Sequence, residues 1–450
     1  MLPDKTLKSF KFNIFENQLK IINMKKIFTF FFFILAITTQ AQEISTDEQD
    51  IIEYLRLNEQ EQINFLENTV NINSGTLNLP GVKKVGMIYK NELDALGFET
   101  SWITMPDSVG RAGHLFAEIN KGKGKTILLI GHIDTVFEDD HEFQSFTRQG
   151  NIGKGPAAND MKGGNAVIIY ALKALHAAGA LEDKNIIVAF TGDEEKPGQP
   201  LSISRHHLVE AGKKADIALG FETASGMNHA TVARRGSSGW SLKVKGKQSH
   251  SSGIFSENTG AGAIFEAARI LNSFYTDVKG EELLTFNPGV ILGGTKVNYD
   301  GAQSKGTAFG KTNVVASELE VYGGLRFISE EQKENARKKM KNIVNNNLPG
   351  TSASIDFSDS YPAMKPTDGN MELLKVLDKI SLDLGYGSVE AYDPGRRGAA
   401  DISFIAQYVD GLDGLGVMGS GAHSPGETIN LETFIPLTER AALLIHRLSK

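Results

Sequence analysis

The feature that most constrains the fold is an alternation of short apolar runs with helical periodicity between residues 113 and 220. Residues 126–131 and 186–191 are continuous apolar runs, which are typical of strands buried on both faces. A shorter run covers residues 216–220, and residues 165–178 repeat their hydrophobic side chains with the period of a helix. Strands that alternate with helices predict an α/β layer with a mixed, largely parallel sheet.

A different pattern follows residue 235. Trp240, Leu242 and Val244 alternate with polar residues, as in a half-buried strand. Helices are expected at residues 261–274 and 330–346, and further strands at residues 290–297, 314–327 and 352–357. The resulting order is β-α-β-β-α-β, which is typical of a self-contained, ferredoxin-like α+β module with two layers.

The chain of 450 residues is long enough for two or three domains. We therefore predict one α/β domain, formed by residues 42–236 and 359–450, which is interrupted by an inserted α+β domain at residues 237–358. Within the first part, residues 51–96 are expected to form two helices.

Residues 24–41 have the organisation of a secretory signal peptide. A short basic segment follows Met24, an apolar run covers residues 27–37, and small residues end at Ala41. The run is too short for a good membrane span, so we expect cleavage, no stable span afterwards, and a periplasmic or secreted protein. An uncleaved anchor is the alternative. Residues 1–23 are predicted to result from a start codon placed too far upstream.

Charge and cysteine content exclude some classes of function. The net charge is -7 and the pI about 5.9, so the chain has no basic field that would hold nucleic acid. It contains no cysteine, which excludes disulfides and thiolate metal ligands. Any bound metal must therefore be held by His, Asp and Glu.

Two of the predicted buried strands end in residues that can bind metals. His132 and Asp134 follow the first; in an extended segment both side chains point to the same side, so Asp134 can orient the His132 ring. Asp193, Glu194 and Glu195 follow the second, and three adjacent acids need cations or raised pKa values to coexist. One carboxylate can then bind a metal while another accepts a proton from water. Taken alone, a His after a strand is more often an ordinary loop residue, and the three acids are equally consistent with a solvated acidic loop.

Three further residues complete the set. Asp160 opens a helix, where it is either a helix cap or a carboxylate that bridges two cations. Glu222 follows the short run that ends at residue 220, and His423 lies in a Gly-rich loop near the chain end. The edge where parallel strands end is where open α/β sheets bind ligands. Two His with several carboxylates suit Zn²⁺, and a bridging carboxylate implies two ions about 3.5 Å apart.

With these motifs in this order and spacing, the sequence resembles the co-catalytic zinc metallopeptidases that include glutamate carboxypeptidase, aminoacylase and succinyl-diaminopimelate desuccinylase. The likeness extends from about residue 68 to the C-terminus. It implies two zinc ions per subunit, for which cobalt or manganese can substitute. The implied ligands are His132 and Glu222 for one ion, Glu195 and His423 for the other, and Asp160 between them, with a cis peptide bond to Met161. Asp134 would orient His132, and Glu194 would be the general base.

The sub-pattern in residues 233–236 and 248–252 is similar to the secreted glutamate carboxypeptidase branch. This resemblance implies that residues 237–358 form a dimerisation domain, so that a homodimer is expected. It also implies that His250 reaches the partner subunit's active site and stabilises the oxyanion of the reaction. Without the resemblance, His250 would be interpreted as a histidine of a surface loop.

The same resemblance concerns substrate binding. Asn313 and Arg326 match positions that the family uses near the substrate carboxylate. Glutamate-releasing members have an Arg where this chain has Tyr361, and a Tyr offers one hydrogen bond instead of a bidentate clamp. Arg396 and Arg397 are therefore candidates to replace that clamp. Tyr361 and Arg397 complete the predicted substrate-binding set.

The function expected from these residues is hydrolysis of an amide bond next to a free carboxylate. The substrate would be a small peptide or an N-acyl amino acid, and the enzyme a carboxypeptidase that releases Glu or a similar residue. The alternatives are an N-acyl amino acid deacylase or a dipeptidase on the same site. A more distant alternative is an inactive periplasmic peptide-binding protein.

Overall fold

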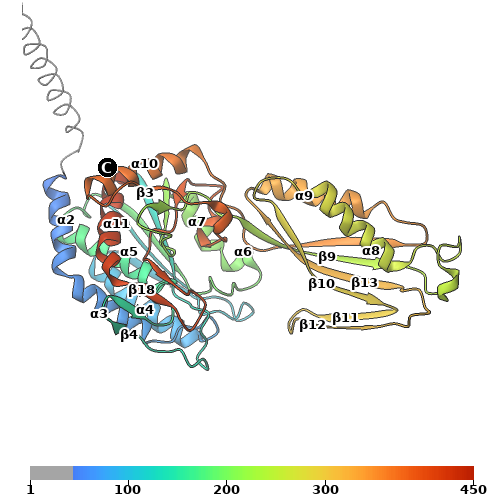
Figure 1. Cartoon of the computed structure of the whole chain (residues 1–450). Helices are drawn as coiled ribbons and strands as arrows, with labels where there is room; N and C mark the ends of the chain where they lie inside the picture. Colours follow the sequence, from blue (N-terminus) through green and yellow to red (C-terminus); the bar gives the residue numbers. More distant parts are fainter. Residues whose placement is uncertain (1–43) are drawn as a thin grey trace, which may run out of the picture.

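The molecule has two lobes, and the smaller one is an insertion into the larger (Figure 1). This computed structural model describes residues 44–450. The predicted signal peptide, residues 24–41, and the predicted upstream extension, residues 1–23, lie outside the described residues. Among the residues that are described, no helix is both long and apolar enough to cross a membrane.

A six-stranded sheet in the order β1-β2-β6-β3-β7-β16 forms the centre of the larger lobe. Its strands are β1 (Glu99–Ile103), β2 (His114–Asn120), β3 (Thr126–His132), β6 (Asn185–Thr191), β7 (Ile217–Gly220) and β16 (Gly411–Leu412). β6, β3, β7 and β16 are parallel, whereas β2 runs antiparallel to β6, and β1 at the edge of the sheet pairs antiparallel with β2. The prediction of a mixed, largely parallel sheet is therefore confirmed.

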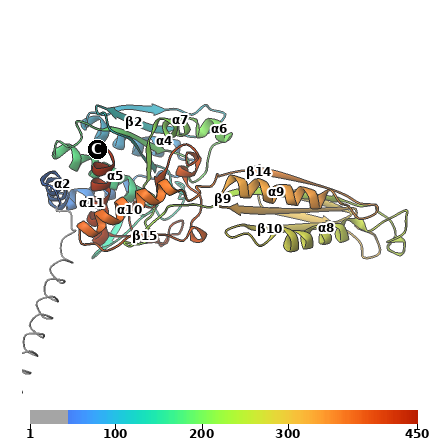
Figure 2. The same cartoon turned by 90° about the horizontal axis from the view of Figure 1, so that it is seen from above.

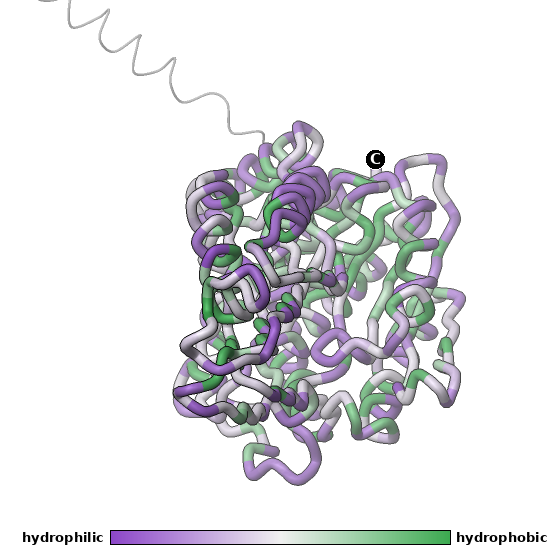
Figure 3. Tube along the Cα trace, turned by 90° about the vertical axis from the view of Figure 1, so that its right-hand side faces the viewer, coloured by the Kyte–Doolittle hydropathy of each residue, from purple (hydrophilic) through white to green (hydrophobic). Residues whose placement is uncertain are grey.

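Helices cover both faces of this sheet, which explains the continuous apolar runs. Ile127 and Leu129 belong to the core under α5 (Lys162–Ala177) and α11 (Phe434–Leu448). Leu128 and Ile130 point the other way and pack with Leu208 of α7 (His206–Lys214). The remaining long helices of this lobe are α2 (Thr46–Leu57), α3 (Glu59–Val70), α4 (Leu79–Ala95) and α10 (Asp368–Asp383). In Figure 3 most outer loops are hydrophilic, and the hydrophobic segments lie mainly inside.

The N-terminal part corrects one prediction, because residues 51–96 contribute to three helices instead of two. The additional break lies at Asn58, between α2 and α3. The Asn58 amide donates a hydrogen bond to the carbonyl oxygen of Tyr54 at 2.7 Å. A side chain that bonds a main-chain carbonyl in this way competes with the helical hydrogen bonds, which ends the helix without a Pro or Gly.

The smaller lobe follows the predicted order β-α-β-β-α-β. Its elements are β9 (Gly236–Lys245), α8 (Gly262–Ser273), β10 (Thr285–Gly294), β13 (Glu318–Phe327), α9 (Glu330–Val344) and β14 (Ser352–Asp359). The strands form an antiparallel sheet in the order β10-β13-β9-β14. Both helices lie on one face of it (Figure 2), where Trp240, Leu242 and Val244 form part of a separate core.

A hairpin on the opposite face was not predicted. β11 (Lys296–Asp300) pairs with β12 (Lys305–Phe309), and the Tyr299 ring stacks on Tyr322 of β13 with centroids 4.2 Å apart. The expected strand at residues 290–297 therefore ends at Gly294, and a new strand begins at Lys296. Most hairpin residues are exposed, so the segment has no hydrophobic run by which a strand could be recognised.

Short strands complete the larger lobe. One small sheet has the order β17-β18-β5-β4, and β15 pairs with β8. These strands are β4 (Thr147–Gln149), β5 (Ile152–Lys154), β8 (His229–Ala230), β15 (Glu390–Ala391), β17 (Gly419–Ser420) and β18 (Thr428–Asn430). β17 and β18 are important for the site because the loop between them contains His423.

Candidate metal centre

The predicted metal ligands come together where the parallel strands of the larger lobe end. His132 is the last residue of β3, Glu195 follows β6 in sequence, and Glu222 follows β7. Asp160 lies just before α5, and His423 lies in the loop that follows β17. Five residues that are far apart in the sequence thus meet at one edge of the sheet. Open α/β sheets usually bind their ligands at this edge, where the parallel strands end.

The Asp160 carboxylate lies between the two histidines. Its Oδ1 is 3.3 Å from Nε2 of His132, and its Oδ2 is 3.3 Å from Nε2 of His423. Each oxygen therefore faces a different imidazole, which is the arrangement that a bridging carboxylate needs. The peptide bond between Asp160 and Met161 is cis, as the sequence resemblance implied.

The other two carboxylates divide between the histidines. Oε1 of Glu222 is 3.8 Å from Nε2 of His132, whereas Oε2 of Glu195 is 3.0 Å from Nε2 of His423. The predicted pairing, His132 with Glu222 and Glu195 with His423, therefore matches the distances. His132, Asp160 and Glu195 each offer a ligand atom within 4.8 Å of the others.

The electrostatics of the cluster fit bound cations. Burial raises the pKa of Glu194 and of Glu195, and burial together with Asp160 raises that of Glu222 to about 8. Oε1 of Glu195 is buried without a hydrogen-bond donor. Carboxylates crowded in this way are stabilised as anions by cations. The residues present therefore fit two metal ions, one on each side of Asp160.

Asp134 organises the acidic turn, residues 193–195, as well as the His132 imidazole. Nδ1 of His132 lies 3.0 Å from the main-chain oxygen of Asp134 and 3.5 Å from its carboxylate, so the main chain is the nearer partner. The carboxylate accepts hydrogen bonds from the N–H groups of Glu194, at 2.9 Å, and Glu195, at 3.1 Å. A third comes from the Thr76 hydroxyl at 2.7 Å. Asp134 thereby places the predicted base and a predicted metal ligand at once.

Comparison with known proteins identifies the family. Residues 128–447 match the model of a protein family that is described as "Peptidase family M20/M25/M40". The chain belongs to this peptidase family. It is 27% identical to carboxypeptidase G2 of Pseudomonas sp. (strain RS-16) over 389 residues, which cover 85% of each chain. It is 22% identical to a succinyl-diaminopimelate desuccinylase of Gluconacetobacter diazotrophicus over 365 residues, covering 79% of this chain and 89% of the relative.

The fold likeness extends to solved structures. The YXEP protein of Bacillus subtilis, described as a dinuclear metal binding peptidase from the M20 family, superposes with a TM-score of 0.59. It is 16% identical and covers 88% of this chain and 99% of its own. These relatives identify the present chain as a metal-dependent peptidase or amidohydrolase.

Two residues that support the site of this M20 peptidase received no role from the sequence. The buried Glu427 carboxylate accepts hydrogen bonds from the N–H groups of Ala157, Asn159 and Asp160 at 2.9–3.1 Å. The Asn165 amide donates to the main-chain oxygen of His132 at 2.6 Å. Glu427 follows His423 by four residues, and that short spacing was the one signal that could have indicated its role.

The predicted residues of the smaller lobe are not at the metal centre of their own chain. His250 and Asn313 are both exposed. They lie close together, because the N–H of Ser251, the residue after His250, donates a hydrogen bond to the main-chain oxygen of Asn313 at 2.9 Å. β9 leads the chain about 30 Å away from residue 236 before His250 is reached. Arg326 is exposed too, but it lies near the larger lobe, opposite Ser237 at the start of β9.

The remaining substrate-binding candidates occupy different environments. Arg397 donates to the main-chain oxygen of Thr223 at 3.1 Å, beside Glu222, so its guanidinium borders the metal centre. Arg396 is exposed and lies over the Tyr392 ring at 5.3 Å. The Tyr361 hydroxyl donates to the main-chain oxygen of Glu194 at 2.6 Å. Substrate binding by these residues stays a prediction.

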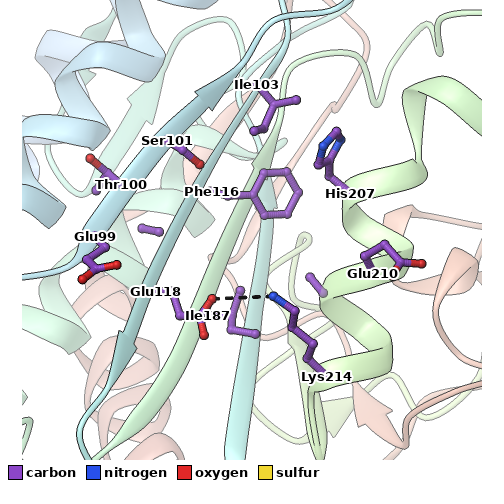
Figure 4. Close-up of a pocket in the computed structure, with 12 residues that line it drawn as sticks. Glu99, Thr100, Ser101, Ile103, Phe116, Glu118, Ile187, His207, Glu210 and Lys214 are labelled. Carbon is purple, nitrogen blue, oxygen red and sulfur yellow. Dashed lines mark ion pairs between the residues drawn. The ribbon is translucent and has the colours of Figure 1, made fainter.

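A separate cavity of about 390 Å³ lies between β1, β2 and α7 (Figure 4). Phe116 and Ile187 contribute apolar side chains to it, and Lys214 lies 4.0 Å from Glu118. Its lining contains none of the predicted ligands or substrate-binding residues. The candidate site is therefore the cluster at the strand ends and not this cavity.

Proposed function

We propose that this M20 peptidase is an exported two-zinc enzyme that hydrolyses an amide bond next to a free carboxylate. The observation that carries the proposal is the Asp160 carboxylate, with one histidine on each oxygen. When bound, the zinc pair supplies Lewis acidity, which polarises the substrate carbonyl and lowers the pKa of water toward neutrality. Cobalt or manganese is expected to substitute for zinc.

Glu194 is the general base of the proposed reaction. Burial holds the pKa of its carboxyl well above the usual range, which suits a group that both accepts and returns a proton. Its carboxylate takes a proton from the attacking water and delivers it to the nitrogen of the leaving amine. Attack on the carbonyl forms the C–O bond and a tetrahedral oxyanion. As this oxyanion collapses, the C–N bond breaks and the nitrogen takes the proton that Glu194 holds. The acid product then loses its remaining proton, so the products are a carboxylate and a protonated amine.

The substrate is proposed to be a small peptide or an N-acyl amino acid whose free carboxylate meets arginine. Arg397 supports this because its guanidinium lies beside Glu222 and makes one hydrogen bond, to the neutral main-chain carbonyl of Thr223. The likeness to carboxypeptidase G2 favours a carboxypeptidase. The desuccinylase relative supports the second candidate, an N-acyl amino acid deacylase that uses the same site; a dipeptidase is a further variant of it.

A homodimer formed through residues 237–358 is part of the proposal. The tip surface of the smaller lobe exposes Phe255, Ile264 and Phe265 at 67%, 51% and 52%. Clustered apolar side chains of this kind mark interaction sites. Because His250 lies close by and far from its own metal centre, its proposed role as oxyanion donor requires the active site of a second subunit. Phe265→Glu should convert the dimer to a monomer in light scattering.

Export rests on residues 24–41, whose pattern supports a cleaved signal and a periplasmic or secreted location. N-terminal sequencing of the mature protein tests this. A mature chain that begins near Gln42 supports it, and one that begins far from there contradicts it.

Substitution of the base tests the activity itself. The zinc-loaded protein should hydrolyse at least one substrate among folyl-glutamate, N-acetyl amino acids and dipeptides, and amidation of the free carboxylate should slow it. Glu194→Gln should keep two zinc ions per chain by mass spectrometry, while the rate falls by about 10²–10⁴. A Glu194→Gln enzyme with a near wild-type rate would refute the mechanism.

A further inference from the structure

A buried charged network lies behind the acidic turn and takes no part in the mechanism above. Arg205 is 2% exposed, and it lies between Asp193, which is fully buried, and Asp401, which is 3% exposed. Its Nη1 is 2.5 Å from Asp193 Oδ1, and its Nε is 2.8 Å from Asp401 Oδ1. None of the three is a predicted metal ligand. Charges are rarely buried without a structural or functional reason.

Tyr361 connects this network to the base. Nη2 of Arg205 donates to the Asp193 main-chain oxygen at 3.0 Å and to the Tyr361 hydroxyl at 3.4 Å. The hydroxyl in turn donates to the main-chain oxygen of Glu194 at 2.6 Å. On the other side of the turn, Asp134 accepts the Glu194 N–H at 2.9 Å. The main chain of Glu194 is therefore held at both its N–H and its C=O.

The orientation of the Tyr361 side chain is itself well determined. Its ring packs against Phe404 with centroids 4.9 Å apart, and the Arg205 guanidinium lies over the same Phe404 ring at 5.3 Å. The main-chain oxygen of Tyr361 accepts the N–H of Ser237, at the start of β9, at 2.8 Å. Tyr361 thus lies where the chain passes between the two lobes, and its hydroxyl contacts the acidic turn of the larger lobe.

We propose that Tyr361 is a positioning residue for Glu194, with Arg205 holding its hydroxyl in place, and that it does not clamp the substrate carboxylate. The inference rests on the proposed role of Glu194 as the base. A main chain held at both ends keeps the Glu194 side chain in the geometry that proton transfer needs, and small displacements of catalytic groups are costly to the rate. The hydroxyl that a clamp would need is already committed to the enzyme's own main chain.

Tyr361→Phe tests this because it removes the hydroxyl and keeps the ring on Phe404. In the zinc-loaded protein we expect kcat to fall about tenfold, the equivalent of one buried hydrogen bond, with KM unchanged within about twofold. A clamp would give the opposite split, so a raised KM with unchanged kcat overturns the proposal. Tyr386→Phe is the matched control. Its hydroxyl bonds Glu439, away from the acidic turn, and its removal should leave kcat and KM unchanged.

Hydrogen exchange gives a second readout that does not depend on activity. The N–H groups of residues 192–196 should exchange several-fold faster in Tyr361→Phe than in the wild type or in Tyr386→Phe, with or without zinc. Unchanged exchange there, with only a lower melting temperature, would show a purely structural role and overturn the proposal. If the wild type hydrolyses no substrate, the proposed function fails, but the exchange comparison still decides whether Tyr361 holds the turn.

Discussion

The two lobes use their sheets differently. The sheet of the larger lobe has helices on both faces, and its strand ends hold a cluster of predicted ligands that ranges from the buried His132 to the exposed His423. The sheet of the smaller lobe has helices on one face only, and its predicted site residues His250, Asn313 and Arg326 are exposed. The larger lobe thus brings the predicted metal ligands together by itself, whereas the role proposed for His250 of the smaller lobe requires a second subunit.

The largest effect is expected when His250 of the smaller lobe is removed. His250→Ala should lower kcat by about 10²–10³, the usual effect of losing an oxyanion donor, without lowering zinc content, because no predicted metal ligand is touched. Mixed dimers of His250→Ala and Glu194→Gln subunits should regain activity. In them one site combines an intact Glu194 with the partner's His250. Absence of any recovery would place His250 outside the partner's site.

A core substitution tests whether the lobes are energetically separate. Leu242 is fully buried in the core of the smaller lobe, so Leu242→Ala should destabilise that lobe by about 3 kcal/mol. Calorimetry should show an early transition of the smaller lobe, while zinc still binds the larger one. Ile291→Ala, at a position 55% exposed, is the control and should change stability by less than about 0.5 kcal/mol. Loss of zinc binding together with the early transition would show that the lobes unfold as one.

The metal centre should make the larger lobe sensitive to pH when zinc is removed. The folded-state pKa of Glu222 is raised to about 8 from 4.5, so the folded protein binds more protons than the unfolded chain between these values. Its stabilising contribution is present below pH 4.5 and is lost as the pH rises toward 8. Denaturant titrations of the zinc-free protein should show stability falling by about 2 kcal/mol between pH 5 and 7. Saturating zinc should remove this slope, and a rise with pH would contradict the assignment.

The smallest effect is expected at Glu427, which holds the main chain of the Asp160 loop but is not itself a predicted metal ligand. Glu427→Gln weakens its acceptance of three main-chain N–H groups and should reduce zinc affinity about tenfold, as changes behind metal ligands do. Chelator competition measures this. Glu432, which is exposed nearby, provides the control, and Glu432→Gln should leave the affinity unchanged. If both variants bind zinc with the same affinity, Glu427 does not support the metal centre.

Much of the architecture was predictable because local patterns of hydrophobic residues indicate the strands. The apolar runs that became β3 and β6 are long enough to identify buried strands, and β9 shows the alternation of a half-buried one. The β11–β12 hairpin escaped prediction because its residues are exposed and its stability comes from stacking on β13. The helix break at Asn58 escaped because a single side-chain hydrogen bond causes it.

The candidate site also has a part that could be predicted from the sequence and a part that could not. The residue types at the strand ends already indicated metal ligands, because two His and several acids together follow strands at the edge where open α/β sheets bind ligands, and a chain without cysteine can hold zinc only with His, Asp and Glu. The sequence contained no sign that the Asp134 carboxylate holds the main chain of the acidic turn, or that Glu427 holds the Asp160 loop. Hydrogen bonds between segments far apart in the chain leave no local pattern.

The α/β sheet, the β-α-β-β-α-β insertion and the set of residues able to bind two metals could be predicted from the sequence, because periodicity and residue chemistry are local properties. The packing of the folded chain determines which histidine faces which oxygen of Asp160, and it brings the Tyr361 hydroxyl to the main chain of Glu194. It also placed His250 far from its own metal centre. These facts depend on the packing of distant segments and on the direction of each side chain, which spacing along the chain does not specify.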